Sequence, residues 1–266
     1  MDDYKKKYYE QSEFWDKDFQ NNSAEINRLK EILEIIPKDV QTVLDVGAGN
    51  GFFVNSLKIY PGFVKIVGLD QSKEALKHVQ TERVLGSISN LPFENSSFDL
   101  VTCLEVLEHL PQDDFKKGIL ELQRVSKKYI LITVPNENNL EHSLVMCPEC
   151  YCWFNPYFHM RSFNKENLKN LLNNFNLIQL KEIGPISKEY CYPSLLLTFF
   201  RNWKKPLPLK TSICPQCGYQ NKYEKTENFH KKKSNFALFS LLESLTKLVF
   251  PKKEKHRWFL ALYQKK

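Results

Sequence analysis

A glycine-rich turn constrains the fold of this chain of 266 residues more than any other feature. A β-branched run at 42–46 precedes the turn, and apolar residues at helical spacing follow it at 52–57. This order predicts a strand, a tight turn and a helix. The turn brings an acid and three glycines together as Asp45-x-Gly47-x-Gly49-x-Gly51. Because a ligand can approach a glycine backbone where a Cβ would clash, the turn predicts a nucleotide-type site at the end of a strand.

Strand and helix patterns continue to alternate after the turn. Further strands are predicted at 65–70, 84–85, 98–103 and 129–135, with helices at 72–80 and 113–125. Such alternation implies right-handed crossovers and a parallel sheet that carries its ligand sites at the carboxyl ends of the strands. We therefore predict an α/β, doubly wound, mostly parallel sheet of the Rossmann-like kind, with a zinc-binding insert before the last strand.

The chain divides into four predicted parts. Residues 1–37 form an N-terminal helical cover, with Ser23 as the N-cap of a helix that ends at Pro37. Residues 38–192 form the core, which ends with a helix at 164–175 and a strand at 177–183. Residues 193–255 form an insert that contains several prolines and an apolar helical stripe at 238–248. Residues 256–266 return to the core as its final strand.

The spacing of the turn distinguishes between possible cofactors. A dinucleotide fingerprint places its third glycine where Phe52 stands, and a P-loop needs a Gly-Lys-Ser/Thr that is absent here. A second acid, Asp70, ends the second predicted strand. Its carboxylate can accept both hydroxyls of a ribose, while Asp45 can favour an ammonium group. A ligand with a ribose, a cationic amine and no phosphate describes S-adenosylmethionine.

Residues 40–183 resemble the class I S-adenosylmethionine-dependent methyltransferases, in particular the type 11/12 families. The resemblance rests on five motifs in register: Val43 to Gly51, Gly68-Leu69-Asp70, Leu91 to Asp99, Glu105-x-x-Glu108-His109 and the fifth strand. It implies that the glycine turn flanks the methionine part, that Asp70 and Gln71 bind the ribose, and that Ser87 and Ile88 bind the adenine. The complete set of implied cofactor-binding residues is Asp45, Gly47, Gly49, Asn50, Gly51, Asp70, Gln71, Ser87, Ile88 and Cys103.

Three alternatives remain open for these residues. The glycines can serve packing alone in an α/β core without a cofactor. Many related chains carry an acid where Ser87 stands, so Ser87 is equally explained as a turn residue. Cys103 has the pattern of an ordinary buried cysteine.

The element Glu105-x-x-Glu108-His109 follows the fourth strand, at the sheet edge where the methyl group would lie. Methyl transfer to a hydroxyl or amine needs an acceptor for the proton, and His109 is the natural base because its ordinary pKa is near 6.5. The same element occurs in ubiquinone-pathway O-methyltransferases and small-RNA 2′-O-methyltransferases, which imply a later histidine, here His159. We predict His109, Glu105 and His159 as catalytic residues. By resemblance, one alternative is Mg²⁺ or Mn²⁺ bound by His109, Glu105, His159 and Glu108. In a second alternative, Glu108 only caps a helix or forms a salt bridge on it.

Seven cysteines include two Cys-Pro-x-Cys pairs. Two such knuckles present four thiolates to one tetrahedral ion, so Cys147, Cys150, Cys214 and Cys217 predict a structural zinc site. A filled four-thiolate site has no open position, which indicates a scaffold role. Reduced thiols without metal and a redox pair are the alternatives, and Cys152 can displace one ligand. Cys191 has the pattern of a buried cysteine.

The net charge of +7 resides in residues 227–266, where ten Lys and Arg face three Glu. Together with the aromatic residues of 193–209, this basic region predicts contact with a membrane surface or with RNA; a plain core for the insert explains the apolar residues equally well. No apolar run is long enough to span a bilayer, and the N-terminus lacks an apolar signal core, so a cytoplasmic location is expected. The predicted function is methyl transfer to an oxygen or nitrogen, with a small-molecule, glycan or lipid-linked acceptor favoured. RNA methylation and a catalytically silent cofactor-binding scaffold are the alternatives.

Overall fold

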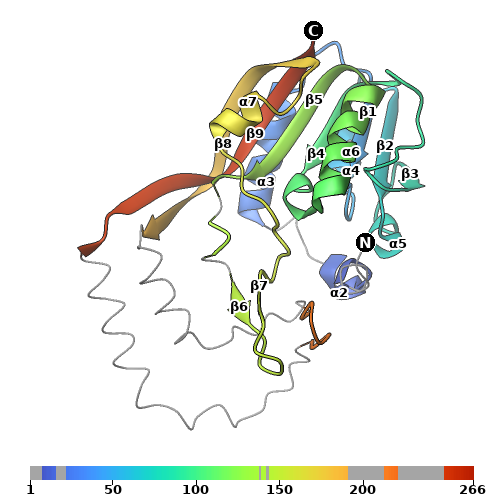
Figure 1. Cartoon of the computed structure of the whole chain (residues 1–266). Helices are drawn as coiled ribbons and strands as arrows, with labels where there is room; N and C mark the ends of the chain where they lie inside the picture. Colours follow the sequence, from blue (N-terminus) through green and yellow to red (C-terminus); the bar gives the residue numbers. More distant parts are fainter. Residues whose placement is uncertain (1–7, 16–21, 138, 142–143, 191–212, 221–248) are drawn as a thin grey trace.

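The computed structural model describes residues 8–15, 22–137, 139–141, 144–190, 213–220 and 249–266 (Figure 1). The predicted helical stripe at 238–248, the aromatic segment at 193–209 and Cys191 lie outside the described residues. In the part of the chain that is described, no helix has both the length and the apolar character needed to cross a membrane.

A seven-stranded sheet organises the described chain, with strand order β3-β2-β1-β4-β5-β9-β8. The first five strands pair in parallel, while β9 lies antiparallel between β5 and β8. The prediction of a mostly parallel, doubly wound sheet is therefore confirmed. The strands are β1 (Thr42–Val46), β2 (Lys65–Asp70), β3 (Glu82–Leu85), β4 (Phe98–Leu104), β5 (Ser126–Pro135), β8 (Phe175–Tyr190) and β9 (Lys252–Lys265).

Helices cover both faces of this sheet (Figure 1). On one face, α6 and α7 bury Leu122, Val125 and Leu168 against the strands. On the other, α3 and α4 bury Ile32, Phe53 and their neighbours. Two hydrophobic cores thus sandwich the sheet, as expected for a doubly wound fold. The helical elements are α2 (Ser12–Trp15), α3 (Ser23–Ile35), α4 (Phe52–Leu57), α5 (Lys73–Leu76), the 3₁₀ turn η2 (Leu107–His109), α6 (Gln112–Val125) and α7 (Lys165–Lys169).

Several element ends differ from the sequence pattern. The side chain of Asn22, rather than Ser23, caps α3 by accepting from the N–H groups of Ala24 and Glu25. The helix predicted at 164–175 ends at Lys169. The last two strands are longer than predicted, because β8 and β9 continue to pair beyond the sheet as far as Tyr190 and Lys252. This outer part is charged and lacks the apolar alternation by which a strand is recognised.

The two-stranded sheet of β6 (Val145–Met146) and β7 (Trp153–Phe154) flanks the first cysteine pair. It lies below the main sheet in Figure 1. The chain returns from β7 to the main sheet through residues 155–163, and the N–H of Met160 donates to the carbonyl oxygen of Glu108 at 2.7 Å. The segment after the cysteines is thereby attached to the turn that follows β4.

Candidate functional site

A cavity of about 430 Å³ opens at the carboxyl ends of β1, β2 and β4. Its lining includes Gly47, Gly49, Asp70, Gln71 and Ile88 as well as Glu105, Glu108, His109 and His159. The sheet edge predicted to bind ligand therefore carries a cavity that joins the two predicted groups of residues. Such concave sites at strand ends are where open α/β sheets bind ligands.

The glycine turn has the backbone conformation that its sequence predicts. Gly47, Gly49 and Gly51 all have positive φ angles, of 81°, 55° and 77°. A Cβ on Gly47 would lie 2.3 Å from a methyl group of Val106, so a side chain there would clash as well as strain the backbone. Glycine is thus required at position 47 both by the positive φ angle and by the lack of room for a side chain.

Asp70 accepts hydrogen bonds from two backbone segments, one through each of its carboxylate oxygens. Oδ2 accepts from the N–H of Gly49 at 2.9 Å, and Oδ1 accepts from the N–H of Ser72 at 2.8 Å. Burial raises the pKa of this carboxyl, and the hydrogen bonds from the backbone oppose the rise. Each oxygen keeps a second lone-pair direction, so the carboxylate can still receive the two hydroxyls of a ribose.

Asp45 is buried and is not among the residues that line the cavity, and its predicted contact with a ligand ammonium group stays a prediction. It sits opposite Thr102 in the β1–β4 pair, and its Oδ1 accepts from the Thr102 hydroxyl at 2.6 Å. Because neighbouring side chains of a strand alternate, Val46 rather than Asp45 reaches the cavity. Burial raises the pKa of Asp45 to about 7, although the Thr102 hydrogen bond opposes the rise.

The raised pKa of Asp45 predicts a pH dependence of stability. An acid with a higher pKa in the folded than in the unfolded state favours folding at low pH, and this contribution is lost as the pH rises from about 4 to about 7. We expect ligand-free Asp45→Asn protein to gain melting temperature relative to the unmodified protein on going from pH 5 to pH 8. Each kcal/mol corresponds to about 2–4 °C for a chain of this size. Thermal melts at the two pH values measure this difference, and parallel pH profiles would contradict the assignment.

The remaining predicted cofactor residues fall into two groups. Asn50, Gln71 and Ile88 line the cavity. Ser87 is exposed outside the lining, where its hydroxyl lies 2.9 Å from that of Ser89 within a turn. Cys103 is fully buried in the core and also outside the lining. Ser87 therefore lies in a turn, which was its alternative interpretation. Cys103 lies in the core, as in its alternative interpretation as a buried cysteine.

Acidic and imidazole groups lie close together in the cavity lining. Glu105 follows β4 with a φ of 58°, and its Oε1 lies 3.9 Å from a guanidinium nitrogen of Arg28. Glu108 is fully buried, with Oε1 3.6 Å from Nε2 of His109. The His109 and His159 rings lie edge to face with their centroids 4.8 Å apart. Three of the four predicted residues, Glu108, His109 and His159, thus place donor atoms within 4.8 Å of one another.

Burial shifts the protonation of this cluster. The pKa of Glu108 is raised well above its ordinary value, first by burial and then by the neighbouring Glu105. Burial, and then the charge of Arg257, lowers the pKa of His159 to about 4. Near neutral pH, His159 is therefore an uncharged imidazole that can accept a proton.

Several cavity residues were missed by the sequence analysis. The N-terminal cap, defined here as residues 8–15, contributes Tyr8, Tyr9 and Trp15, and α3 contributes Arg28. The final strand contributes Trp258, over which the Arg28 guanidinium lies at 4.9 Å from the ring centroid. The richness in aromatic residues near the N-terminus was the available signal for the cap. No local pattern connects Arg28 with Trp258.

Both cysteine pairs form the same tight turn. The N–H of Tyr151 donates to the carbonyl of Cys147 at 3.1 Å, and the N–H of Gly218 to that of Cys214 at 3.0 Å. Tyr151 and Gly218, each four residues after the first cysteine of its pair, have positive φ angles of 59° and 72°. The two segments, distant in sequence, therefore have matching knuckle geometry.

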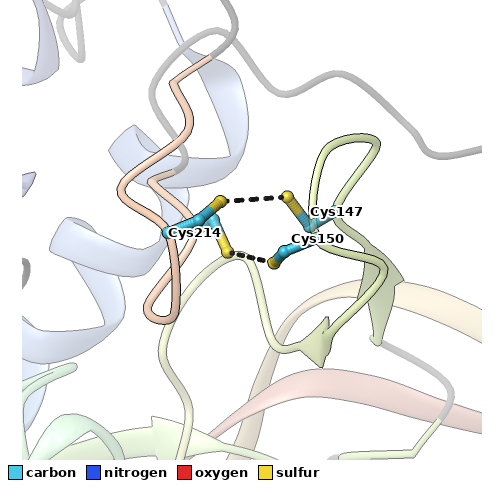
Figure 2. Close-up of side chains that lie close together, drawn as sticks. Cys147, Cys150 and Cys214 are labelled. Atoms are coloured by element: carbon cyan, nitrogen blue, oxygen red, sulfur yellow. Dashed lines mark hydrogen bonds between the residues drawn. The ribbon is translucent and has the colours of Figure 1, made fainter.

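The four predicted cysteine ligands converge (Figure 2). The sulfurs of Cys147 and Cys217 are 3.6 Å apart, and those of Cys150 and Cys214 are 3.5 Å apart. Four thiolates bound tetrahedrally at the usual zinc–sulfur length would be about 3.8 Å apart, whereas a disulfide needs about 2.05 Å. The donor set therefore fits zinc. Cys152 is a fifth nearby thiol, 3.2 Å from the sulfur of Cys214.

Sequence comparisons match part of this chain to methyltransferases. Residues 44–131 match the model of a family described as a methyltransferase domain. The chain is 28% identical to an uncharacterized protein of Methanocaldococcus jannaschii over 64% of this chain and 71% of that protein. It is 33% identical to the ubiquinone biosynthesis O-methyltransferase of Albidiferax ferrireducens, and 29% identical to the small RNA 2′-O-methyltransferase of Mus musculus. These two matches cover 32% and 35% of this chain, and 37% and 29% of those proteins.

Solved structures resemble a larger part of the chain. A SAM-dependent methyltransferase from Thermotoga maritima, described as a possible histamine N-methyltransferase, has a TM-score of 0.54 at 17% identity and covers 99% of both chains. A SAM-dependent methyltransferase from Methanosarcina mazei has a TM-score of 0.51 at 18% identity, covering 88% of this chain and 96% of that one. The fold therefore resembles that of these solved methyltransferases, and residues 44–131 match a methyltransferase domain.

Proposed function

We propose that this chain is an S-adenosylmethionine-dependent methyltransferase that moves a methyl group to an oxygen or nitrogen of an acceptor. The observation that carries the proposal is the continuity of one cavity from the Asp70 and glycine-turn end to the His109 and His159 end. A ribose held at Asp70 would direct the rest of the nucleoside along the glycine turn toward the imidazoles. The cavity can therefore bring a methyl donor and an acceptor together, which is the principal requirement of an in-line displacement.

The side chains supply the proton chemistry of the transfer. When bound, S-adenosylmethionine supplies the methyl group on a sulfonium. The proton that the acceptor loses on methylation would pass to an imidazole, His109 or His159. Glu108 lies beside His109 and can orient its ring, while Arg28 lies near Glu105. The aromatic residues of the cap reduce the access of water to the reacting atoms.

Calorimetry tests the cofactor part of this proposal. We expect S-adenosylmethionine and its demethylated product, S-adenosylhomocysteine, both to bind, and a component of cell extract to gain the mass of one methylene. A protein that binds both nucleosides but methylates nothing in extract would favour the silent scaffold. Binding of neither would contradict the proposed function.

A metal-assisted reaction is a second candidate, favoured by the close approach of Glu108, His109 and His159. A carboxylate and two imidazoles can bind Mn²⁺ or Mg²⁺, which would lower the pKa of an acceptor hydroxyl. Glu105, the fourth predicted ligand, is not part of this group and lies near Arg28 instead. If the reaction is metal-assisted, turnover requires added Mn²⁺ or Mg²⁺ and is lost in EDTA. If an imidazole base acts without metal, turnover changes neither with the added ion nor with EDTA.

The acceptor and the location of the protein remain proposals. A small-molecule, glycan or lipid-linked acceptor is favoured, with peripheral membrane contact through the basic C-terminal region; RNA is the competing acceptor. In the described part of that region, Lys253 pairs with Glu137 and Lys255 donates to the Glu137 carbonyl oxygen. Liposome sedimentation and an RNA gel shift at varied salt distinguish the two partners. A cytoplasmic location is proposed because zinc-bound thiolates suit a reducing compartment.

We also propose that Cys147, Cys150, Cys214 and Cys217 hold a structural zinc ion. Burial acts against ionisation of Cys214, but hydrogen bonds, first from the backbone N–H of Cys217 and then from Cys152, lower its pKa to about 6. A thiolate is the form that binds metal. The proposal is supported by the sulfur separations and by the matching geometry of the two turns.

Metal analysis of the purified protein tests the zinc site. We expect about one zinc per chain, because four thiolates fill one tetrahedral ion. The variants Cys147→Ser and Cys217→Ser should lose most of the metal and melt at a lower temperature. Cys152→Ser is the matched control and should retain the metal. Loss of zinc in Cys152→Ser with retention in Cys217→Ser would show that the fifth cysteine is the true ligand.

A further inference from the structure

Three distant segments meet in a small apolar cluster beside the cysteine turns. Tyr8, Phe158 and Ile213 are each less than a tenth exposed, and they bury one another. The rings of Tyr8 and Phe158 lie edge to face with their centroids 4.8 Å apart. Ile213 directly precedes the ligand Cys214, and Phe158 directly precedes the cavity residue His159. The second cysteine turn is therefore packed against both the N-terminal cap and the segment that carries His159.

A polar contact attaches the other end of the same turn to the cap. Ile213 and Gln220 pair as an antiparallel bridge that closes the turn. The side-chain amide of Gln220 donates to Oε1 of Gln11. Both ends of the turn thus contact residues 8–11, so its position is linked to that of the cap.

The opposite side of the cap covers the cofactor end of the cavity. The carbonyl oxygen of Tyr9 accepts from the hydroxyl of Ser72 at 2.8 Å and from Nε1 of Trp15 at 2.6 Å. A Cβ added to Gly49 would lie 3.0 Å from the Trp15 ring, so this indole lies directly over the glycine turn. The cap is thereby held between the cysteine turns and the predicted nucleoside site.

We propose that metal bound to Cys147, Cys150, Cys214 and Cys217 acts as a clamp that holds the cap and the His159 segment against the cavity, so that cofactor affinity depends on the metal. This inference rests on the proposed methyltransferase function. The two cysteine turns are 63 residues apart in sequence, and the metal joins them across that distance. Without the metal, the free energy needed to order the cap has to come from cofactor binding, which lowers the observed affinity.

Hydrogen exchange and calorimetry on the full chain test the clamp. In metal-stripped protein we expect amide exchange in residues 8–15 and 157–160 to accelerate about tenfold, while β1 and β4 stay protected. We expect the affinity for S-adenosylhomocysteine to fall about tenfold, which is about 1.4 kcal/mol. Ile213→Ala, with its four ligands intact, should reproduce both effects in metal-loaded protein, and stripping its metal should add little.

A matched control and defined outcomes make the test decisive. Ile59→Ala removes a largely exposed isoleucine outside the cavity and should change neither measurement. The clamp is overturned if the protein binds no metal, or if stripped protein keeps cap protection and affinity. If removal of the metal unfolds the sheet, the metal-loaded Ile213→Ala variant provides the test. Unchanged amide exchange in the cap of this variant overturns the clamp. If neither metal-loaded nor metal-stripped protein binds the nucleoside, the proposed function fails. The clamp is then tested by amide exchange in the cap alone.

Discussion

The His109→Ala variant is expected to lose about 10²- to 10⁴-fold in kcat, the usual contribution of a positioned general base. Its affinity for S-adenosylhomocysteine should stay within about twofold, because the proposed nucleoside contacts are Asp70 and the glycine turn, whereas His109 is proposed to face the acceptor. The measurement is transfer of a labelled methyl group to extract components, beside calorimetry on the same protein. A loss in kcat with unchanged cofactor binding would place His109 in the chemical step.

His159→Ala and His78→Ala complete this experiment. His159 also lines the cavity, and its low pKa keeps it uncharged, so comparison of the two cavity variants identifies the base. The base variant should also lose the acidic limb of the pH–rate profile. His78 lies outside the cavity lining and should retain full turnover after replacement. Near-normal kcat in both cavity variants would show that neither imidazole accepts the proton.

The Asp70→Asn variant is expected to bind S-adenosylmethionine about 100-fold more weakly. Hydrogen bonds to a charged group contribute about 1.5–3 kcal/mol each, and a carboxamide replaces one acceptor oxygen by a donor. That donor would face either the N–H of Gly49 or that of Ser72, since both already donate to Asp70. The substitution therefore disturbs the glycine turn as well as the proposed ribose contact.

Calorimetry with a surface control separates these effects from a general loss of structure. Asp113→Asn is the matched control, because Asp113 is exposed and outside the cavity lining. We expect it to bind the nucleoside as the unmodified protein does. Asp70→Asn should still melt cooperatively, at a somewhat lower temperature. Unchanged affinity in Asp70→Asn would remove the principal support for a ribose site at the end of β2.

The parts of this fold that the sequence could predict are those with a local signal. β1, the glycine turn and α4 follow one another within sixteen residues, and positive φ angles at Gly47, Gly49 and Gly51 are what a run of alternate glycines permits. The cysteine pairs likewise carry their own turn geometry. Asp70 was found because β2 ends at the same sheet edge as β1.

The remaining site residues could not be predicted because their signal is not local. Arg28 and Trp258 meet only after β9 has entered the sheet. Asp45 was placed in the cavity from its motif, whereas the alternation of β1 turns it toward Thr102. For Cys103 the sequence left two interpretations open, a cofactor contact and a buried cysteine, and the residue packs in the core. Side-chain direction along a strand depends on its exact register, which a short motif does not specify.

The position of β9 has a consequence for biosynthesis. This strand follows β8 in sequence, yet it lies between β5 and β8, and Ile130 pairs with Tyr263. Until the ribosome has released residues 252–265, the hydrogen-bonding edge of β5 has no neighbour, and such open edges recruit other chains. Pairing across so long a stretch of polypeptide is also slow. Newly made protein therefore passes through a stage, before β9 has been synthesised, at which chaperone protection of the β5 edge matters most.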